Sequence, residues 1–161
     1  MAIQKRPALY QLRDTVTQSS AGAYTESTIT TNLPLSERLG MIIKEVEFEF
    51  IDFDTDSNNT QSLQLLCESQ TEEIYIDDES LIAKAAIRTE VSGTATNFAF
   101  QPTLFKQTFV YGITVAQKEL YFGIDTPEDP AKGGVKTGKI RISYELIKLS
   151  DAQLIALATR C

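Results

Sequence analysis

Apolar and polar residues alternate with a period of two along several segments, and this pattern most narrows the folds open to the chain. In the clearest segment, residues 42–50, apolar residues fall on one face and three glutamates fall on the other, namely Glu45, Glu47 and Glu49. The alternation recurs in residues 63–67, 120–124 and 139–146. This is the period of a β-strand with one buried and one exposed face, so the sequence predicts a mainly β fold.

Together with the turn residues that separate the segments, the pattern predicts seven or eight strands. A helix is predicted over residues 78–88, because apolar residues recur at helical spacing after an acidic start. A second short helix follows Ser150, which forms a capping box with Gln153. Strands and helices do not alternate regularly, which argues against a parallel sheet. We therefore predict an antiparallel two-sheet sandwich of jelly-roll type, with one inserted helix and a short C-terminal helix.

The first 24 residues contain few apolar side chains, and residues 15–23 are small and polar. Residues 1–24 carry a net charge of +2, against −7 for the whole chain of 161 residues, which leaves −9 for the remainder. We therefore predict a flexible N-terminal arm over residues 1–24 and one β-sandwich domain over residues 25–161. The arm's basic residues, Lys5, Arg6 and Arg13, are candidates for contacts with other chains.

The composition excludes several kinds of chemistry. The chain has no histidine, which removes the Ser-His-Asp triad, the Cys-His pair and histidine-bound metals. The Gly- and Lys-rich residues 132–139 lack the spacing of a phosphate-binding loop. We therefore expect a protein that is not an enzyme. The acidic charge also argues against nucleic-acid binding by the domain surface, so only the arm is a candidate for that contact.

No apolar stretch has the length of a membrane span or of a signal peptide, so we expect a soluble protein made in a cytoplasm. Two cysteines, Cys67 and Cys161, do not make a disulfide framework. Cys67 lies in an apolar strand pattern and is expected to be a buried small hydrophobe. Cys161 is expected to be a free thiol.

One loop has oxygen-bearing side chains at alternate positions, as calcium loops do. This candidate metal site comprises Asp52, Asp54, Asp56 and Asn58. The pattern then departs from that of an EF-hand, because Ser57 stands where glycine is needed and Leu63 where the bidentate glutamate is needed. The other interpretation is a turn rich in Asp and Asn that binds no ion.

Because the ligand pattern is incomplete, we expect folding to require no calcium or other cofactor. Adding a chelator to the isolated subunit should leave its unfolding midpoint unchanged. An ion bound at 100 times its dissociation constant would contribute about 2.7 kcal/mol, which is readily seen as a shifted midpoint. A drop of that size on chelation, abolished by Asp54→Asn, would contradict this expectation.

The glutamates at 45, 47 and 49 could be interpreted as catalytic carboxylates, because residues two apart on a strand are about 7 Å apart. That spacing is found on any charged strand face, so a solvated face or a charged interface between subunits is favoured. Seven aromatic residues between positions 98 and 122 could form a sugar-binding platform. Most of them alternate with polar residues, which favours a place in the core.

The chain resembles the single jelly-roll capsid (coat) proteins of tailless icosahedral viruses. The resemblance rests on the polar arm, the chain length, the strand count, the inserted helix at 78–88 and a last strand that runs into a helix at 139–153. The resemblance implies a structural virion protein, made in the host cytoplasm. This capsid subunit would assemble with copies of itself and other shell proteins, and its arm would contact neighbouring subunits. The alternative is a carbohydrate-binding or adhesive β-sandwich module of a phage fibre or cell surface.

Overall fold

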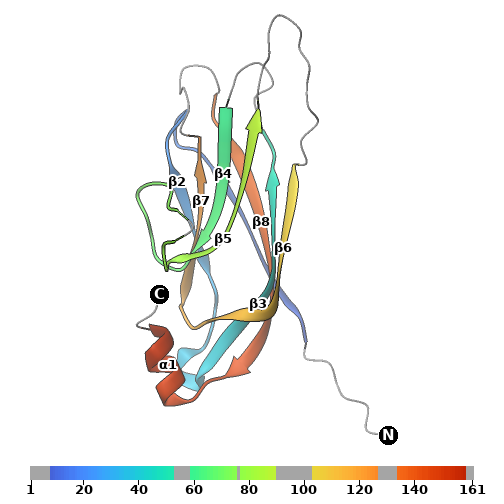
Figure 1. Ribbon diagram of the computed structural model, residues 1–161. Coiled ribbons are helices and arrows are strands. Elements are labelled where there is room, and N and C mark those ends of the chain that lie inside the picture. The colour runs from blue at the N-terminus through green and yellow to red at the C-terminus, as the bar shows by residue number, and fades with distance from the viewer. Residues whose placement is uncertain (1–7, 53–58, 76, 90–102, 127–133, 159–161) are drawn as a thin grey trace, which may run out of the picture.

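The computed structural model describes residues 8–52, 59–75, 77–89, 103–126 and 134–158, which form two four-stranded sheets packed face to face (Figure 1). The first sheet has the strand order β1 (Tyr10–Thr17), β8 (Thr137–Lys148), β3 (Leu39–Phe50) and β6 (Leu104–Val115). The second has the order β2 (Thr25–Thr30), β7 (Glu119–Asp125), β4 (Asn59–Leu66) and β5 (Leu81–Thr89). A short 3₁₀ helix, η1 (Leu35–Glu37), precedes β3, and the helix α1 (Asp151–Ala158) follows β8.

Within the described residues, all neighbouring strands are antiparallel, and only β4 and β5 are consecutive strands of one sheet. The other consecutive strands lie in different sheets, which is how an eight-stranded jelly roll is wound. The predicted antiparallel sandwich and C-terminal helix are confirmed. The capping box is confirmed as well: the backbone N–H of Ser150 donates to Gln153 Oε1 at 3.0 Å, and the N–H of Gln153 donates to Ser150 Oγ at 3.2 Å.

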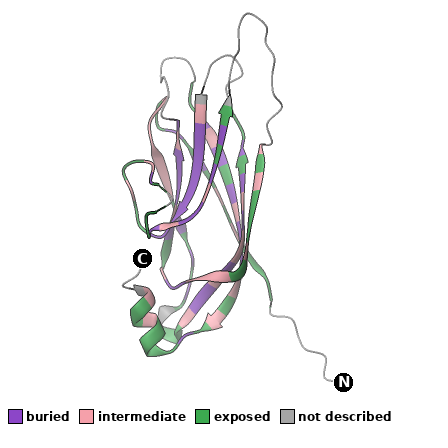
Figure 2. Ribbon diagram, in the orientation of Figure 1, coloured by how far each residue is buried: buried purple, intermediate pink, exposed green. Residues whose placement is uncertain are grey.

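The core lies between the two sheets, where the strands present their apolar faces to one another (Figure 2). Phe48 of β3 is 1 % exposed and stacks on Phe122 of β7, with ring centroids 6.2 Å apart. Leu63 and Leu65 of β4 are fully buried in the same cluster. The alternation seen in the sequence therefore identifies the buried face of these strands.

The strand β6 is irregular at its middle. Ile113 pairs with Ile43 and Thr108 pairs with Glu45, so residues 109–112 of β6 stand opposite Lys44 alone. Gly112 has a φ of 75°, and a Cβ at this position would collide with the side chain of Ile42. A bulge of this kind bends its strand, and glycine is needed here for both reasons.

The helix predicted over residues 78–88 is wrong, because residues 81–89 form β5. From Ala83 to Arg88 buried residues alternate with half-buried or exposed ones, and the strand pairs with β4 along its length. Alanine has a high helix propensity, and three alanines made the segment look helical. Pairing with β4 and burial against the core outweigh that local preference.

The boundary predicted at residue 24 is also wrong, because β1 belongs to the sandwich. It pairs with β8 along its whole length, from Tyr10 opposite Tyr144 to Thr17 opposite Thr137. The next residue, Gln18, is buried and bridges three groups: it donates to Ala23 O and Thr126 Oγ1, both at 2.9 Å, and accepts from the Lys136 N–H at 3.0 Å. Residues 1–7 lie outside the described residues.

The structure describes one of the two cysteines, Cys67. Cys67 is buried in the core, as predicted. It is disulfide-bonded, however, so the expectation that it serves only as a small hydrophobe is wrong. Cys161 lies outside the described residues.

Gln61 of β4 is 1 % exposed, and neither its Nε2 nor its Oε1 has a hydrogen-bond partner in the described part of the chain. A buried amide without partners costs about 1–3 kcal/mol. Gln61→Leu is therefore expected to raise the free energy of unfolding by about that amount, as measured by urea denaturation.

Gln64 is the matched control for this substitution. It is equally buried on the same strand, but its Nε2 donates to Tyr24 Oη at 3.0 Å and its Oε1 accepts from the Ile74 N–H at 3.2 Å. Gln64→Leu should therefore lower the free energy of unfolding. Equal losses in the two variants would contradict the assignment of Gln61 as an unsatisfied group.

Candidate interaction surface on the first sheet

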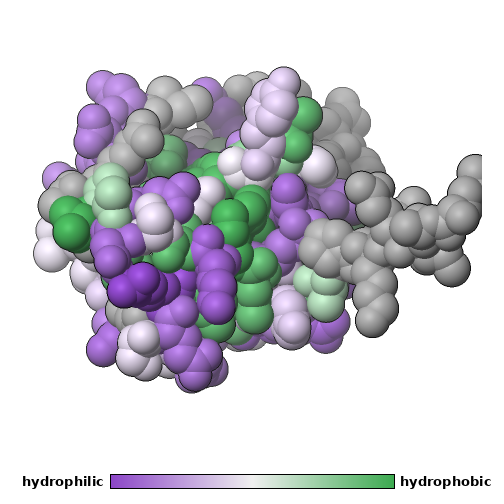
Figure 3. All heavy atoms as spheres, turned by 90° about the horizontal axis from the view of Figure 1, so that it is seen from below, coloured by the Kyte–Doolittle hydropathy of each residue, from purple (hydrophilic) through white to green (hydrophobic). Residues whose placement is uncertain are grey.

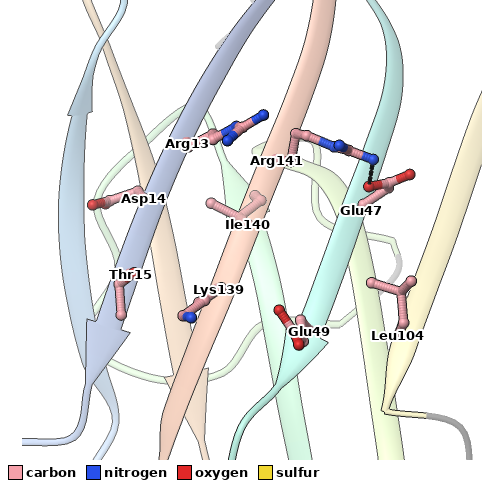
Figure 4. A pocket seen from close by; sticks show the side chains of 9 residues that line it. All are labelled: Arg13, Asp14, Thr15, Glu47, Glu49, Leu104, Lys139, Ile140 and Arg141. Carbon is pink, nitrogen blue, oxygen red and sulfur yellow. Dashed lines mark ion pairs between the residues drawn. The ribbon is translucent and has the colours of Figure 1, made fainter.

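The outer face of the first sheet carries its charged side chains in rows that cross all four strands. The register places Arg13 of β1 opposite Arg141 of β8, Arg141 opposite Glu47 of β3, and Glu47 opposite Lys106 of β6. Each strand contributes one charged residue to this row. The four side chains lie on one face because paired residues point to the same side of a sheet. Figure 4 shows most of this surface, with Arg141 reaching across to Glu47.

Two of the three glutamates on β3 are compensated within the sheet. Lys106 Nζ lies 2.8 Å from Glu45 Oε2 and 3.7 Å from Glu47 Oε1, and Arg141 forms an ion pair with Glu47. The hydrogen bond to Glu45 raises the pKa of the Lys106 ammonium. The side chain of Glu47 is only 11 % exposed. Glu47 is thus part of a cross-strand charge network, and a fully solvated glutamate row is not what the structure shows.

Side chains of like charge form two stripes on this face. Arg13, Lys139 and Arg141 lie on the neighbouring strands β1 and β8 and form what we call the cationic stripe. Beside it on β3 lies the acidic stripe, which comprises Glu45, Glu47 and Glu49. Parts of both stripes line a shallow groove of about 740 Å³ (Figure 4). The groove is open to solvent, unlike the enclosed clefts in which small-molecule sites are usually found.

The structure brings four of the six predicted interface residues onto this one face: Arg13 and the three glutamates. Lys5 and Arg6 lie outside the described residues. Of the candidate calcium ligands, Asp52 follows β3 and is exposed, whereas Asp54, Asp56 and Asn58 lie outside the described residues. Among the residues that the structure describes, no group of three or more acidic or sulfur-bearing side chains is arranged to hold a metal ion.

The cations opposite the glutamates are Lys106, Lys139 and Arg141, and none of them was among the residues predicted from the sequence. Lys139 and Arg141 alternate with apolar residues in a predicted strand, but the sequence does not show which strand pairs with it. Tyr111 was expected in the core, but it is 93 % exposed. The sequence feature that could have indicated the outward direction of Tyr111 is the neighbouring Gly112, which lies in the bulge that turns the tyrosine outward.

The second sheet has a smaller polar cluster on its outer face. Lys84 Nζ of β5 lies 2.6 Å from Glu73 Oε1 and donates to the Ile74 carbonyl oxygen at 3.0 Å, so it ties the segment after β4 to the sheet. Burial raises the pKa of Asp125, and the nearby Glu73 carboxylate raises it further. Burial is the largest single effect on Glu73 and opposes its ionisation, but the hydrogen bonds from Lys84 and Ser62 and the charge of Lys84 together outweigh it and lower the pKa of Glu73.

The raised pKa of Asp125 gives a pH-dependent prediction. A carboxyl group whose pKa is higher in the folded state binds its proton more tightly there, so its ionised form destabilises the fold. This cost is present at neutral pH and disappears as the pH falls below the ordinary value of 3.8. Asp125→Asn should therefore raise the free energy of unfolding at pH 7 and leave it unchanged at about pH 3. An equal change at both pH values in urea melts would contradict this cause.

Among the described residues, no helix has the length and apolarity that crossing a membrane requires.

Comparison with known proteins shows similarity in structure only. No protein-family model and no curated protein sequence matches the chain. A chain of the cyanophage Pam1 capsid asymmetric unit superposes with a TM-score of 0.50 at 16 % identity, over 90 % of this chain and 89 % of that one. The chain thus shares its fold with a chain of a phage capsid.

Two further solved structures align over most of their length with lower TM-scores. The structure of FLHE matches with a TM-score of 0.41 at 11 % identity, over 86 % of this chain and 96 % of that one. A chain of Desmodium yellow mottle tymovirus matches with a TM-score of 0.27 at 11 % identity, over 94 % and 95 %. Neither superposition is close enough to support an argument.

Proposed function

We propose that the chain is a structural virion protein, a capsid subunit that assembles with copies of itself. The fold shared with the cyanophage capsid chain is consistent with this role. The observation that carries the proposal is the edge strand β6. It has 12 residues, and within the described part of the chain no strand pairs with its outer edge.

An uncovered strand edge is a template for pairing with another chain, and monomeric proteins usually shorten, charge or cover such edges. β6 carries one charged residue, Lys106, and exposes three large apolar side chains, Leu104, Val110 and Tyr111. An edge of this length and composition is unusual for a protein that stays alone in solution. It supports a chain whose edge is covered by a neighbour.

The charged stripes support copies of the same chain as the neighbours. A two-fold axis that lies between two such faces and runs parallel to the strands, along the boundary between the stripes, places the cationic stripe of one copy over the acidic stripe of the other, and the reverse contact forms at the same time. The residues that precede β1 are joined to a strand of this face, and in the proposed assembly they would extend the contact. The location of the protein would be the virion, and other shell proteins are further partners.

Light scattering on the purified chain tests the proposal. We expect oligomers whose mass rises with protein concentration, and whose association weakens as salt screens the stripes. Arg13→Glu should weaken association, whereas Arg88→Glu, a reversal at an exposed position of β5 in the second sheet, should have little effect. A monomer at all concentrations would overturn the proposal, and a monomer that binds a glycan column would favour the carbohydrate-binding alternative.

A further inference from the structure

We propose that two copies of the chain dock through a reciprocal contact, in which Val110 and Tyr111 of each copy insert into an apolar cleft beside α1 of the other. This inference rests on the proposed function and names the residues of one of its interfaces. Val110 and Tyr111 together are called the knob. The cleft is the space enclosed by β5, the second half of β6, the end of β8 and α1.

The knob is held outward by the backbone. Val110 is 85 % exposed and Tyr111 is 93 % exposed, and both lie in the bulge where β6 has four residues opposite Lys44. Gly112 ends the bulge with a left-handed conformation that other residues rarely adopt. A large aromatic side chain fixed away from its own core loses little conformational freedom on binding and leaves water when it docks.

The cleft has the size and lining to receive the knob. Its volume is about 550 Å³, whereas a cavity of about 150 Å³ already holds a benzene molecule. Apolar side chains line it from three elements, including Ile82 of β5, Ile147 of β8 and Leu157 of α1. Seen from the end of the molecule where α1 lies, hydrophobic side chains gather in the middle of the surface and hydrophilic ones surround them (Figure 3).

The position of the two features points to a second copy as the occupant. Gly112 follows the knob directly and also lines the cleft, so both lie on one patch of the surface. A two-fold axis beside Gly112 would therefore form both contacts at once, which is the definition of an isologous interface. Because Tyr111 is almost fully exposed, it does not fill the cleft of its own chain.

Charge also favours this exchange. Glu79 is the one charged residue among the described residues that line the cleft. The side chain of Lys44 lies beside Gly112, where its Cδ would be 3.5 Å from an added Cβ. Its ion pair with Glu145 is long, at 3.9 Å. Docking the knob brings Lys44 of one copy toward Glu79 of the other, so the rim of each contact joins opposite charges.

The knob and the cleft supply about half of the area that a standard interface buries. An aromatic side chain buries about 150–250 Å² and covers a similar area of the surface that receives it. Each copy contributes one knob and one cleft, which accounts for about half of the roughly 800 Å² per partner that a standard interface buries. The outer surface of α1 and the charged rim lie next to the cleft and can supply the rest.

Sedimentation velocity on the full chain and its variants tests the inference. Tyr111→Ala should weaken dimer formation by about 100-fold, because a central aromatic contact is worth about tenfold or more and the dimer loses it twice. Tyr75→Ala is the matched control, since it removes another exposed tyrosine, 79 % exposed, from the segment between β4 and β5, away from β6 and from the cleft. It should change the dimer dissociation constant by less than about threefold.

A charge exchange tests the reciprocal geometry. Tyr111→Glu alone and Ala156→Arg alone should each prevent the dimer, because Ala156 lines the cleft on α1 and is exposed. Combined in one chain, the two substitutions should restore it, since the glutamate introduced into each knob would then meet the arginine introduced into the cleft of the other copy. Circular dichroism melts should show every variant folded.

The outcomes separate this inference from the proposed function. If the wild-type chain assembles but Tyr111→Ala and Tyr75→Ala weaken assembly equally, or the double variant does not recover, the knob-and-cleft contact is wrong and the proposed function stands. If the wild-type chain is a monomer at every concentration, both are wrong. Selective loss with Tyr111→Ala and recovery in the double variant support the contact.

Discussion

Phe48→Ala is expected to lower the free energy of unfolding by about 3–5 kcal/mol, the cost of truncating a buried phenylalanine. Phe48 lies at the centre of the contact between the two sheets, where it is 1 % exposed and stacks on Phe122 of the opposite sheet. The substitution leaves a cavity that the paired strands β8 and β6 on either side of β3 prevent from collapsing. Urea denaturation of the dissociated subunit measures the loss.

The control is Leu104→Ala, which removes an apolar side chain that is 58 % exposed. Its cost should stay below about 0.5 kcal/mol, as for surface substitutions in general. A double-mutant cycle with Phe122→Ala should show a coupling of about 0.5–1.5 kcal/mol from the aromatic pair. Equal costs for Phe48→Ala and Leu104→Ala would mean that the assignment of the buried face is wrong.

Deleting residues 2–24 is expected to abolish cooperative unfolding. The deletion removes β1, which pairs with β8 along eight positions, and it removes the buried side chains of Val16 and Gln18. Burial of Val16 contributes about 1.5–3 kcal/mol, and each lost hydrogen bond costs about 0.5–1.5 kcal/mol. The sum approaches the total stability of a typical domain, about 5–15 kcal/mol.

Deleting only residues 2–7 is the matched control, because it leaves β1 whole. The shorter deletion should keep the melting temperature and the circular dichroism spectrum of the full chain. If the chain without residues 2–24 melts cooperatively at the same temperature as the full chain, β1 is not part of the folded domain and the boundary predicted at residue 24 is correct.

Strands with a regular apolar face could be predicted from the sequence. Strands whose conformation is set by pairing with a neighbouring strand could not. From Val46 to Phe50 in β3, from Leu120 to Ile124 in β7 and from Ile140 to Tyr144 in β8, every second residue is apolar and buried, so local pattern and final burial agree. β1 brings few apolar residues of its own and is held by backbone pairing with β8. β5 has alanines that favour a helix locally, and its partner β4 decides its conformation.

The same distinction applies to the candidate interaction surface. The outward direction of the three glutamates follows from the alternation along β3, and this could be predicted. Their partners could not, because Lys106 is 59 positions from Glu47 in the sequence and meets it only through the register of β6 on β3. The direction of Tyr111 depends on the four-residue bulge opposite Lys44, which a two-residue period cannot reveal.

Electron microscopy of the purified full chain tests the central claim most directly. If the chain is a capsid subunit, images at high protein concentration and low salt should show closed particles, rings or regular arrays built from one repeating unit, and these should dissociate as salt is raised. Uniform single subunits under the same conditions, with no growth in size as concentration increases, would contradict the claim.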